Sequence, residues 1–457
     1  MSTNFLVDPN DPSLRSWVES ANDPAGDFPI QNLPFGSIDA GQPVVAVRIG
    51  DRALDLDRAI DHGLLDAAAI AGAEADPEQV RFAFLGDCGA VAAFPAAVRA
   101  RLRGAVAGLV ADGSPRRGEV EACLHPLAGP DAATELLPFA IGDCTDFYAS
   151  LNHATNVGSM FRPTNPLLPN WKHVPIGYHG RASSIVPSGT PVTRPHGQTV
   201  ANDEGPPSFG PSRLLDYELE VGFFVGEGNG LGETIPVAQA WRRIFGFCLV
   251  NDWSARDVQK WEYQPLGPFL AKNFATTISP WVVTTEALEP FLVPGPPRGE
   301  GDPAPLPYLS DPDGRNVDLT LEVLIASAAM REKGLAPTRV SLGGFRDMFW
   351  TPAQMLAHHA SGGCNMRTGD LLASGTVSGP AKESRGCLLE RTWRGTEPIT
   401  LGDGTERKFL QDGDEVILRG WCEKPGFPRI GLGECRGVVR PAFVGGGPGN
   451  AGLGRRG

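Results

Sequence analysis

Several features that define common protein classes are missing from this chain of 457 residues. Its eight cysteines include no C-x-x-C pair, so we expect reduced thiols rather than a zinc site or a disulfide framework. No apolar run is long enough to span a bilayer. The net charge is −13, and no basic stripe is present that would neutralise phosphates. We therefore expect a cytoplasmic protein that binds neither nucleic acid nor a membrane.

Motifs of several enzyme classes are missing as well. The chain has no G-x-S-x-G, which argues against a nucleophile-elbow serine hydrolase, and no G-x-x-x-x-G-K-[ST], which argues against a P-loop. Residues 447–452 match G-x-G-x-x-G only formally, because no strand and helix flank them. Residues 1–17 contain neither a basic nor an apolar segment, so no secretory signal is expected.

The abundance of glycine (57) and proline (42) indicates a turn-rich, β-dominated α+β protein. A chain of this length is expected to divide into two or more domains. A connector containing proline and glycine at 127–137 separates a small N-terminal domain at 1–140, with an expected structural role, from a larger domain at 141–444. Residues 445–457 are a glycine-rich tail that we expect to be disordered.

Local patterns predict several elements within these domains. Residues 42–56 alternate as a β-hairpin that turns at 50–51. Residues 93–111 carry apolar side chains at helical spacing, which predicts an amphipathic helix. Thr351 and Gln354 have the spacing of a capping box, so a helix is expected to begin there.

Residues 215–225 alternate between apolar and acidic side chains, which predicts a strand. Side chains two residues apart on a strand share a face, so Asp216, Glu218 and Glu220 lie on one face with neighbouring Cα atoms about 7 Å apart. Adjacent carboxylates repel each other, and burying them unpaired would raise a pKa strongly. Either this face is solvated or a cation lies between the carboxylates.

Two further segments carry polar side chains that are suited to a site. Residues 141–158 bring an acid, an aromatic residue and a base together, including Asp146 and His153, on a predicted loop. The apolar run at 245–250 predicts a buried strand, and Asp252 follows directly after it. A carboxylate at the end of an apolar strand is placed where active-site residues tend to emerge.

These segments supply carboxylates with no cysteine or clustered histidine beside them. An all-oxygen ligand set selects hard cations, so we expect Mg²⁺ and/or Ca²⁺ rather than zinc or copper. The carboxylates together carry more charge than one divalent ion balances, and Lys272 is the expected additional cation. The candidate ligands are Asp146, Glu218, Glu220 and Asp252.

Short motifs follow one another between residues 140 and 440. They are D-F-Y with H-A-T-N-V-G (146–158), L-P-N-W (168–171), G-Y-H-G-R-A-S-S (177–184), D-Y-E-L-E (216–220), N-D-W-S-A-R-D (251–257), P-L-G-P-F (265–269) and G-D-L-L-A-S-G-T (369–376). Each motif alone is weak, but their ordered concurrence is specific and resembles the fumarylacetoacetase family. Residues 1–140 fit the additional N-terminal domain of that family.

The resemblance implies a hydrolase that splits a carbon–carbon bond. The implied substrate is a small diketo acid, 4-fumarylacetoacetate, which is cleaved to fumarate and acetoacetate in the last step of tyrosine and phenylalanine degradation. The fold that the resemblance implies is a small SH3-like N-terminal barrel followed by a larger mixed β-roll of the fumarylacetoacetase type. The implied assembly is a homodimer.

The resemblance also implies roles for individual residues. The four carboxylates are the implied metal ligands, with a second, Mg²⁺-type position at Asp252, Lys272 and Thr276. His153 is the implied general base, and Glu390 is the carboxylate that orients it. The implied oxyanion donors are Arg256, Gln259 and Lys272, and the implied substrate contacts are Tyr148, Arg162, Tyr178, Gln259, Tyr263 and Thr376.

The residue types suit the chemistry that the resemblance implies. A histidine oriented by a carboxylate is suited to deprotonating water near neutral pH. Arginine, glutamine and lysine donors suit a tetrahedral alkoxide, and a divalent ion suits an enolate leaving group. In one departure from the family, alanine stands at 271 and 275, where glycines are usual around the lysine. Alanine disfavours positive φ, so the backbone there is expected to differ locally.

Two other functions stay open at this point. One is an acylpyruvate or related diketo-acid hydrolase of the same superfamily, whose members are typically shorter and use three metal carboxylates. Asp146 and residues 1–140 argue against it. The more distant alternative is a non-catalytic protein that binds divalent cations, for which replacing His153 would leave metal binding unchanged and no diketo acid would yield product.

Overall fold

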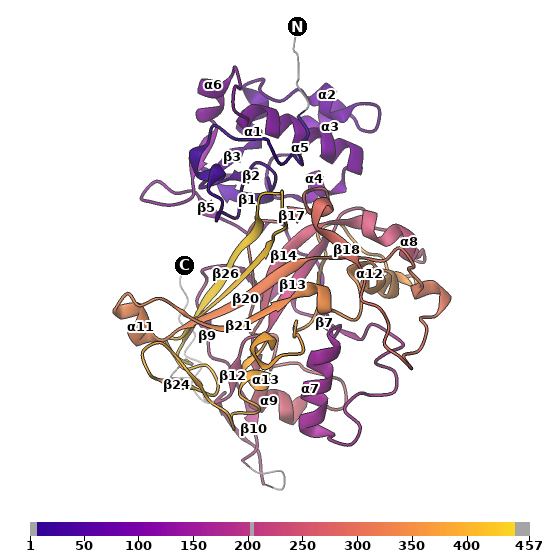
Figure 1. Ribbon diagram of the computed structural model, residues 1–457, viewed down its shortest axis with the longest axis vertical. Coiled ribbons are helices and arrows are strands. Elements are labelled where there is room, and N and C mark those ends of the chain that lie inside the picture. Colours follow the sequence, from indigo (N-terminus) through magenta and orange to yellow (C-terminus); the bar gives the residue numbers. More distant parts are fainter. Residues whose placement is uncertain (1–6, 202–204, 444–457) are drawn as a thin grey trace, which may run out of the picture.

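The computed structural model describes residues 7–201 and 205–443 (Figure 1). Its N-terminal part contains an antiparallel sheet with the strand order β4-β3-β2-β1-β5, and helices α1 to α6 lie in the chain between β3 and β4. The strands are β1 (Phe35–Asp39), β2 (Pro43–Ile49), β3 (Arg52–Asp55), β4 (Leu124–Pro126) and β5 (Thr134–Glu135). The helices are α1 (Leu56–Asp61), α2 (Ala67–Ala71), α3 (Pro77–Arg81), α4 (Gly89–Ala93), α5 (Ala96–Val110) and α6 (Arg117–Glu121).

Local sequence patterns place these N-terminal elements well. The predicted hairpin is confirmed as β2 and β3, and it turns through Gly50 with a φ of +56°. Only glycine adopts such a φ without strain, and a Cβ there would also meet Ser20. The predicted helix at 93–111 is confirmed as α5, which begins at Ala96 because the preceding Pro95 is extended.

The larger part of the chain is built on a mixed eight-stranded sheet with the order β7-β6-β22-β13-β14-β16-β8, in which β17 also pairs with β14. The pairs β22–β6 and β16–β8 are parallel, and the other pairs are antiparallel. The strands are β6 (Cys144–Phe147), β7 (Gly177–Gly180), β8 (Ile185–Pro187), β13 (Leu219–Val225), β14 (Ile244–Asp252), β16 (Thr276–Ile278), β17 (Val283–Thr284) and β22 (Leu371–Ala373).

A second sheet, with the order β21-β20-β25-β26-β9, packs against this large sheet. The strands β25 and β26 lie against β14, and side chains from both sheets, such as Phe247 and Leu418, share one core cluster (Figure 1). The strands are β9 (Val192–Thr193), β20 (Leu319–Ala326), β21 (Thr338–Gly344), β25 (Glu415–Cys422) and β26 (Ile430–Arg440).

Short strand pairs and helices surround the two sheets. The pairs are β10 (His196–Thr199) with β11 (Ser208–Pro211), β12 (Leu215–Asp216) with β15 (Ser254–Ala255), β18 (Leu292–Pro294) with β19 (Arg315–Val317), and β23 (Ile399–Thr400) with β24 (Glu406–Arg407). The helices are α7 (Leu151–Phe161), α8 (Val237–Ala240), α9 (Arg256–Glu262), α10 (Thr285–Leu288), α11 (Ala328–Glu332), α12 (Pro352–Ala360) and α13 (Leu388–Arg391). The predicted capping box is confirmed, because the Thr351 side chain accepts from the Gln354 backbone and the Gln354 side chain accepts from the Thr351 backbone at the start of α12.

The alternation at 215–225 predicts the two faces correctly. The odd-numbered side chains from Leu215 to Val225 lie in the core cluster between the sheets, whereas Phe224 lies in a second cluster on the opposite face. The segment is interrupted, because β12 pairs with β15 and β13 pairs with β14. Every residue from 215 to 225 is buried, so the interpretation of a solvated acidic face is wrong.

The second cluster joins the N-terminal part to the large sheet. The ring of Phe139 lies 4.4 Å from that of Phe224 and 5.8 Å from that of Phe245, and Phe35 of β1 lies 5.9 Å from Phe245. A backbone bridge pairs Phe35 with Val282. The predicted domain boundary at 140 stays a prediction.

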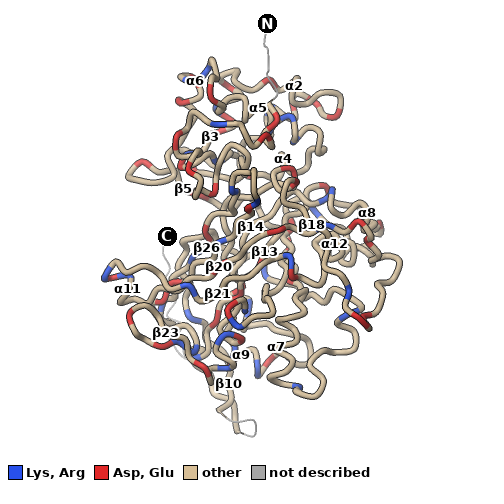
Figure 2. The backbone as a smooth tube through the Cα atoms, in the orientation of Figure 1, with Lys and Arg blue, Asp and Glu red and all other residues tan. Residues whose placement is uncertain are grey.

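The composition-based expectations can be compared with the described residues. All eight cysteines are free, and all except Cys364 are buried. No helix within 7–201 and 205–443 is long and apolar enough to cross a membrane. Figure 2 shows acidic and basic residues intermixed over both parts of the molecule. The predicted tail at 445–457 and its G-x-G-x-x-G match lie outside the described residues.

We predict that Phe224→Ala destabilises the whole chain, because it removes a fully buried ring from the contact between the N-terminal part and the large sheet. The expected loss in the free energy of unfolding is about 3–5 kcal/mol. Denaturant titration followed by tryptophan fluorescence measures it. Phe82→Ala is the control, since Phe82 is 66% exposed and its loss is expected to change little. A loss below about 1 kcal/mol for Phe224→Ala would contradict this account of the contact.

Candidate active site

Four buried carboxylates meet where three strands of the large sheet come together. Asp146 lies on β6, Glu220 on β13 and Asp252 at the end of β14, while Glu218 directly precedes β13. One oxygen from each lies within 4.8 Å of the others. The structure therefore brings together all four candidate ligands that the sequence suggested.

The acidic cluster fits a hard divalent cation. Both carboxylate oxygens of Glu220 and Oδ1 of Asp146 are buried and have no hydrogen-bond partner. Burial raises the pKa of both groups well above its usual value, and the neighbouring carboxylates raise it further. Buried, unpaired carboxylate oxygens cost several kcal/mol unless a cation compensates them. An all-oxygen donor set is the kind that Mg²⁺ and Ca²⁺ bind.

Lys272 lies inside this cluster and donates to both Glu218 and Asp252. Burial alone would raise the pKa of Glu218, but the ammonium of Lys272 and the guanidinium of Arg256 outweigh it and hold that pKa well below its usual value. An ammonium has no lone pair to offer a metal, so here Lys272 balances charge. The hydroxyl of Thr276 lies 3.5 Å from Oδ1 of Asp252, and the Mg²⁺-type position implied for these three residues stays a prediction.

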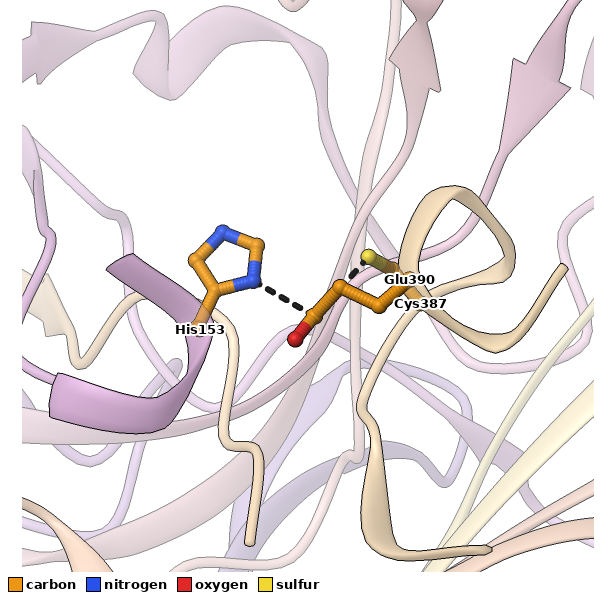
Figure 3. A group of neighbouring side chains, drawn as sticks. All are labelled: His153, Cys387 and Glu390. Carbon is orange, nitrogen blue, oxygen red and sulfur yellow. Dashed lines mark hydrogen bonds and ion pairs between the residues drawn. The ribbon is translucent and has the colours of Figure 1, made fainter. Parts of the chain in front are cut away.

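A histidine–carboxylate pair lies beside the cluster. His153 Nδ1 is 2.6 Å from Glu390 Oε2, and Figure 3 shows the other ring nitrogen pointing away from Glu390. Burial would raise the pKa of Glu390, but His153 and further hydrogen bonds lower it to about 2. Glu390 is therefore ionised at neutral pH, and its charge fixes the proton of His153 on Nδ1.

The prediction of a loop at 141–158 is wrong. Asp146 lies on a strand, and His153 is the third residue of α7, where Ser150 caps the helix by accepting from the His153 backbone at 3.3 Å. The polar composition suggested a loop, but a parallel pairing of β6 with β22, more than 200 residues away, orders the first half.

Three neutral side chains that sequence reasoning did not assign hold the Glu390 carboxylate. Asn156 donates to Oε1 at 2.9 Å, and Ser378 donates to Oε2 at 2.9 Å. Cys387 donates to Oε2 at 3.2 Å, as Figure 3 shows. The sequence held one signal for this arrangement, since Asn156 follows His153 by one helical turn on α7.

Two buried side chains, Arg256 and Thr376, carry candidate donors to a substrate. Arg256 is buried, its Nη1 lies 2.8 Å from Glu218 and 3.1 Å from Gln259 Oε1, and its Nη2 has no hydrogen-bond partner. The Thr376 hydroxyl is also buried without a partner. A buried donor without a hydrogen-bond partner destabilises the folded state, so these two groups are candidates for contact with a ligand.

Two of the tyrosines predicted to contact the substrate, Tyr148 and Tyr178, lie in different parts of the site. The Tyr148 ring lies edge-on to His153 at 5.2 Å; burial raises the pKa of Tyr148, as do Glu390 and Glu218, while Arg162 opposes the rise. The Tyr148 ring thus contacts the base, and its hydroxyl is within electrostatic reach of Glu390, Glu218 and Arg162. The Tyr178 hydroxyl lies 2.9 Å from carboxylate oxygens of both Asp146 and Asp252.

The remaining predicted contacts are exposed. The Arg162 side chain donates to the Pro166 carbonyl at 3.1 Å, and Tyr263 follows the end of α9, one turn after Gln259. The alanines at 271 and 275 cause no conflict, because the described non-glycine residues with positive φ are Leu33, Trp393 and Arg394. The backbone around Lys272 therefore accommodates these alanines.

The fold and the site define an enzyme in which a buried carboxylate cation site lies next to a histidine–glutamate pair. Comparison with known proteins identifies its family. The family profile "Fumarylacetoacetate (FAA) hydrolase C-terminal" matches residues 144–440. The chain is 49% identical to the fumarylacetoacetase of Bos taurus and 46% identical to that of Homo sapiens, in each case over 94% of this chain and 99% of the relative. It is 48% identical to the fumarylacetoacetase of Caenorhabditis elegans, over 94% of this chain and 100% of the relative. The chain belongs to the fumarylacetoacetate hydrolase family.

We predict that Glu220→Gln weakens Mg²⁺ and Ca²⁺ binding at least about tenfold, or ~1.4 kcal/mol. Without metal the variant is expected to melt at a higher temperature than the wild type, because one of the repelling buried carboxylates is gone. With metal the wild type is expected to have the higher melting temperature, because it binds the ion more tightly and is stabilised more by it. Thermal unfolding with chelator and with added ion measures both effects.

The control for this experiment is Glu322→Gln on β20, whose carboxylate lies 3.7 Å from Arg339 and away from the cluster. This variant is expected to keep the metal response of the wild type. If Glu220→Gln also keeps that response, the acidic cluster is not the cation site.

Proposed function

We propose that this chain hydrolyses 4-fumarylacetoacetate to fumarate and acetoacetate, the last step of tyrosine and phenylalanine degradation. The observation that carries the proposal is the His153–Glu390 pair lying beside the buried acidic cluster, in a chain that shares 46–49% identity with fumarylacetoacetases over 94% of its length. Hydrolysis of a 1,3-dicarbonyl requires a base for water, donors for an alkoxide and stabilisation of an enolate. Each has candidates at this site.

His153 is the proposed general base. Because Nδ1 donates its proton to the ionised Glu390, the lone pair of the imidazole is on Nε2. Nε2 takes a proton from water, and the hydroxide oxygen bonds to the carbonyl carbon of the fumaryl group. Glu390 then stabilises the imidazolium while Asn156 and Ser378 keep the carboxylate in place.

The alkoxide that forms needs hydrogen-bond donors. The free Nη2 of Arg256, the amide of Gln259 and the third N–H of Lys272 are the proposed donors. When the alkoxide collapses, the carbon–carbon bond breaks, its electron pair leaves with acetoacetate as the enolate, and the imidazolium returns a proton. The products are fumarate and acetoacetate, and water supplies the added oxygen and hydrogens.

Mg²⁺ and/or Ca²⁺ is the proposed cofactor, held by Asp146, Glu218, Glu220 and Asp252. A second, Mg²⁺-type position is proposed near Asp252, Lys272 and Thr276, where Lys272 balances charge and does not ligate the ion. When bound, such an ion supplies Lewis-acid stabilisation to the dicarbonyl oxygens and to the enolate. The proposed contacts for the carboxylates and carbonyls of the substrate are Tyr148, Arg162, Tyr178, Gln259, Tyr263 and Thr376.

Several finer assignments belong to the same proposal. Residues 1–140 are proposed to form an SH3-like domain, and residues 141–444 a catalytic β-roll of the fumarylacetoacetase type followed by a tail at 445–457. The proposed location is the cytoplasm, with no nucleic-acid or membrane partner. The free cysteines support this location, and the absence of a basic stripe in the sequence argues against a nucleic-acid partner.

A homodimer is also part of the proposal, and an exposed apolar patch supports it. Leu266 is 96% exposed, Phe269 is 65% exposed and Trp261 is 42% exposed, all on α9 or directly after it. The Trp261 ring donates to Gln198, whose partner across the strand pair is the exposed Phe209. Exposed apolar side chains gathered in this way typically mark an interface.

The first test is a spectrophotometric assay of fumarylacetoacetate with pure protein, with and without chelator. We predict metal-dependent loss of the substrate and formation of fumarate. Cleavage of acylpyruvate instead would show that the chain is a related diketo-acid hydrolase of the same superfamily that uses the same site. No turnover of either substrate would favour a protein that only binds cations.

The matched variants are His153→Ala and His358→Ala, since His358 lies on α12 against Tyr308. Removing the base is expected to lower kcat by at least about 10²–10⁴-fold, whereas His358→Ala leaves kcat unchanged. Both variants should still bind Mg²⁺. Turnover by His153→Ala within tenfold of the wild type would exclude His153 as the base.

For the dimer, light scattering is predicted to give twice the 48.5 kDa mass of one chain. Leu266→Glu combined with Phe269→Glu places charges on the proposed patch and is expected to shift the mass toward that of one chain. Leu231→Glu, at a residue that is 83% exposed elsewhere, is the control and should leave the mass unchanged. A double variant that keeps the full mass would place the interface on another surface.

A further inference from the structure

Asp216 is a fully buried carboxylate that ends β12, two residues before Glu218. Its Oδ2 accepts from Arg256 Nε and from the Leu389 backbone, both at 2.9 Å. Its Oδ1 accepts from the backbones of Leu388 at 2.7 Å and Tyr217 at 2.9 Å. Every partner is a donor, so the carboxylate is satisfied on both oxygens.

One of these partners leads to the acidic cluster. Arg256 turns its Nε toward Asp216 and its Nη1 toward Glu218, 2.8 Å away. The guanidinium is rigid and planar, so fixing Nε fixes the position of the remaining nitrogens. Asp216 therefore sets where Arg256 meets Glu218, and where its unpaired Nη2 points.

The backbone N–H groups of Leu388 and Leu389 connect Asp216 to the His153–Glu390 pair. Leu388 and Leu389 are the first residues of α13, and the next residue is Glu390. The first N–H groups of a helix need external acceptors, and the N-cap residue Cys387 provides no side-chain cap. A helix of four residues is not stable by its own hydrogen bonds, so its placement depends on outside contacts. Asp216 provides one from a strand more than 170 residues away.

We infer that Asp216 is a positioning residue that holds Arg256 against Glu218 and Glu390 against His153 at the same time. One buried carboxylate thereby fixes the distance between the cation side and the base side of the site. Asp216 itself contacts neither His153 nor the unpaired oxygens of the cluster. This inference rests on the proposed function for its kinetic consequences, and its metal-binding consequences are independent of it.

Asparagine at this position cannot satisfy the same partners. It has one oxygen acceptor and one NH₂ donor, whereas both oxygens of Asp216 face N–H groups. Either orientation of the amide therefore places donors against donors, at α13 or at Arg256. A buried donor that loses its acceptor either moves or destabilises the fold by the free energy of its desolvation. A displacement of about 1 Å at a catalytic group can lower the rate about 10²-fold.

The experiment compares Asp216→Asn with Asp414→Asn. Asp414 is also buried, accepts from Arg407 Nε and Nη2 at 2.8 and 2.9 Å, and accepts from the Gln411 backbone at 2.8 Å. Like Asp216, it accepts only from an arginine and from backbone N–H groups, but Arg407 does not touch the site. Both variants are expected to lower the melting temperature.

Only Asp216→Asn is expected to lower kcat for fumarylacetoacetate, by about 10²-fold or more at saturating Mg²⁺, with KM within about threefold. It is also expected to weaken Mg²⁺ binding, measured by calorimetry, about tenfold, because Arg256 no longer holds Glu218. Asp216→Glu restores the charge and both acceptor oxygens, so it should recover part of kcat.

Equal kcat for the two asparagine variants would overturn the inference and leave Asp216 a purely structural residue. Unchanged Mg²⁺ affinity in Asp216→Asn would remove the link to Glu218. If Asp216→Asn does not fold, Asp216→Glu is compared with Asp414→Glu, and the inference requires a larger kcat loss at 216. A wild type without turnover would count against the proposed function, while the Mg²⁺ measurement would still test Asp216.

Discussion

Repulsion among the four buried carboxylates is the constraint on which the rest of the site depends. Asp146, Glu218, Glu220 and Asp252 cannot all be ionised out of water unless positive charge is supplied to them. The chain supplies part of it through Lys272 and Arg256, which explains why the pKa of Glu218 is lowered while that of Glu220 is raised. The oxygens that no side chain satisfies define the place for a divalent cation.

The fold meets this constraint with strand pairing rather than with loops. β6, β13 and β14 are held in register by backbone hydrogen bonds, so their carboxylates cannot move apart to relieve the repulsion. The second sheet and the N-terminal part cover both faces of the large sheet and exclude water. Exclusion of water in turn strengthens each ion pair inside the site.

The base is built differently from the cation site. His153 and Glu390 lie on α7 and α13, outside the large sheet, and Asn156, Ser378 and Cys387 fix the carboxylate. The two halves of the site therefore need a connection across separate elements. Arg256 contacts Glu218, the Tyr148 ring contacts His153, and the buried Asp216 contacts elements that belong to each half.

The sequence by itself determined the features that depend on neighbours along the chain. Alternation at 215–225, the hairpin at 42–56 and the capping box of α12 follow from local geometry, and the acidic residues identified the hard-cation chemistry. Only the tertiary structure decided that the predicted loop at 141–158 contains the strand β6 and the start of the helix α7, and that Ser378 and Cys387 hold Glu390. Those outcomes depend on contacts between segments up to hundreds of residues apart, such as β6 with β22, and no local pattern encodes such a distance.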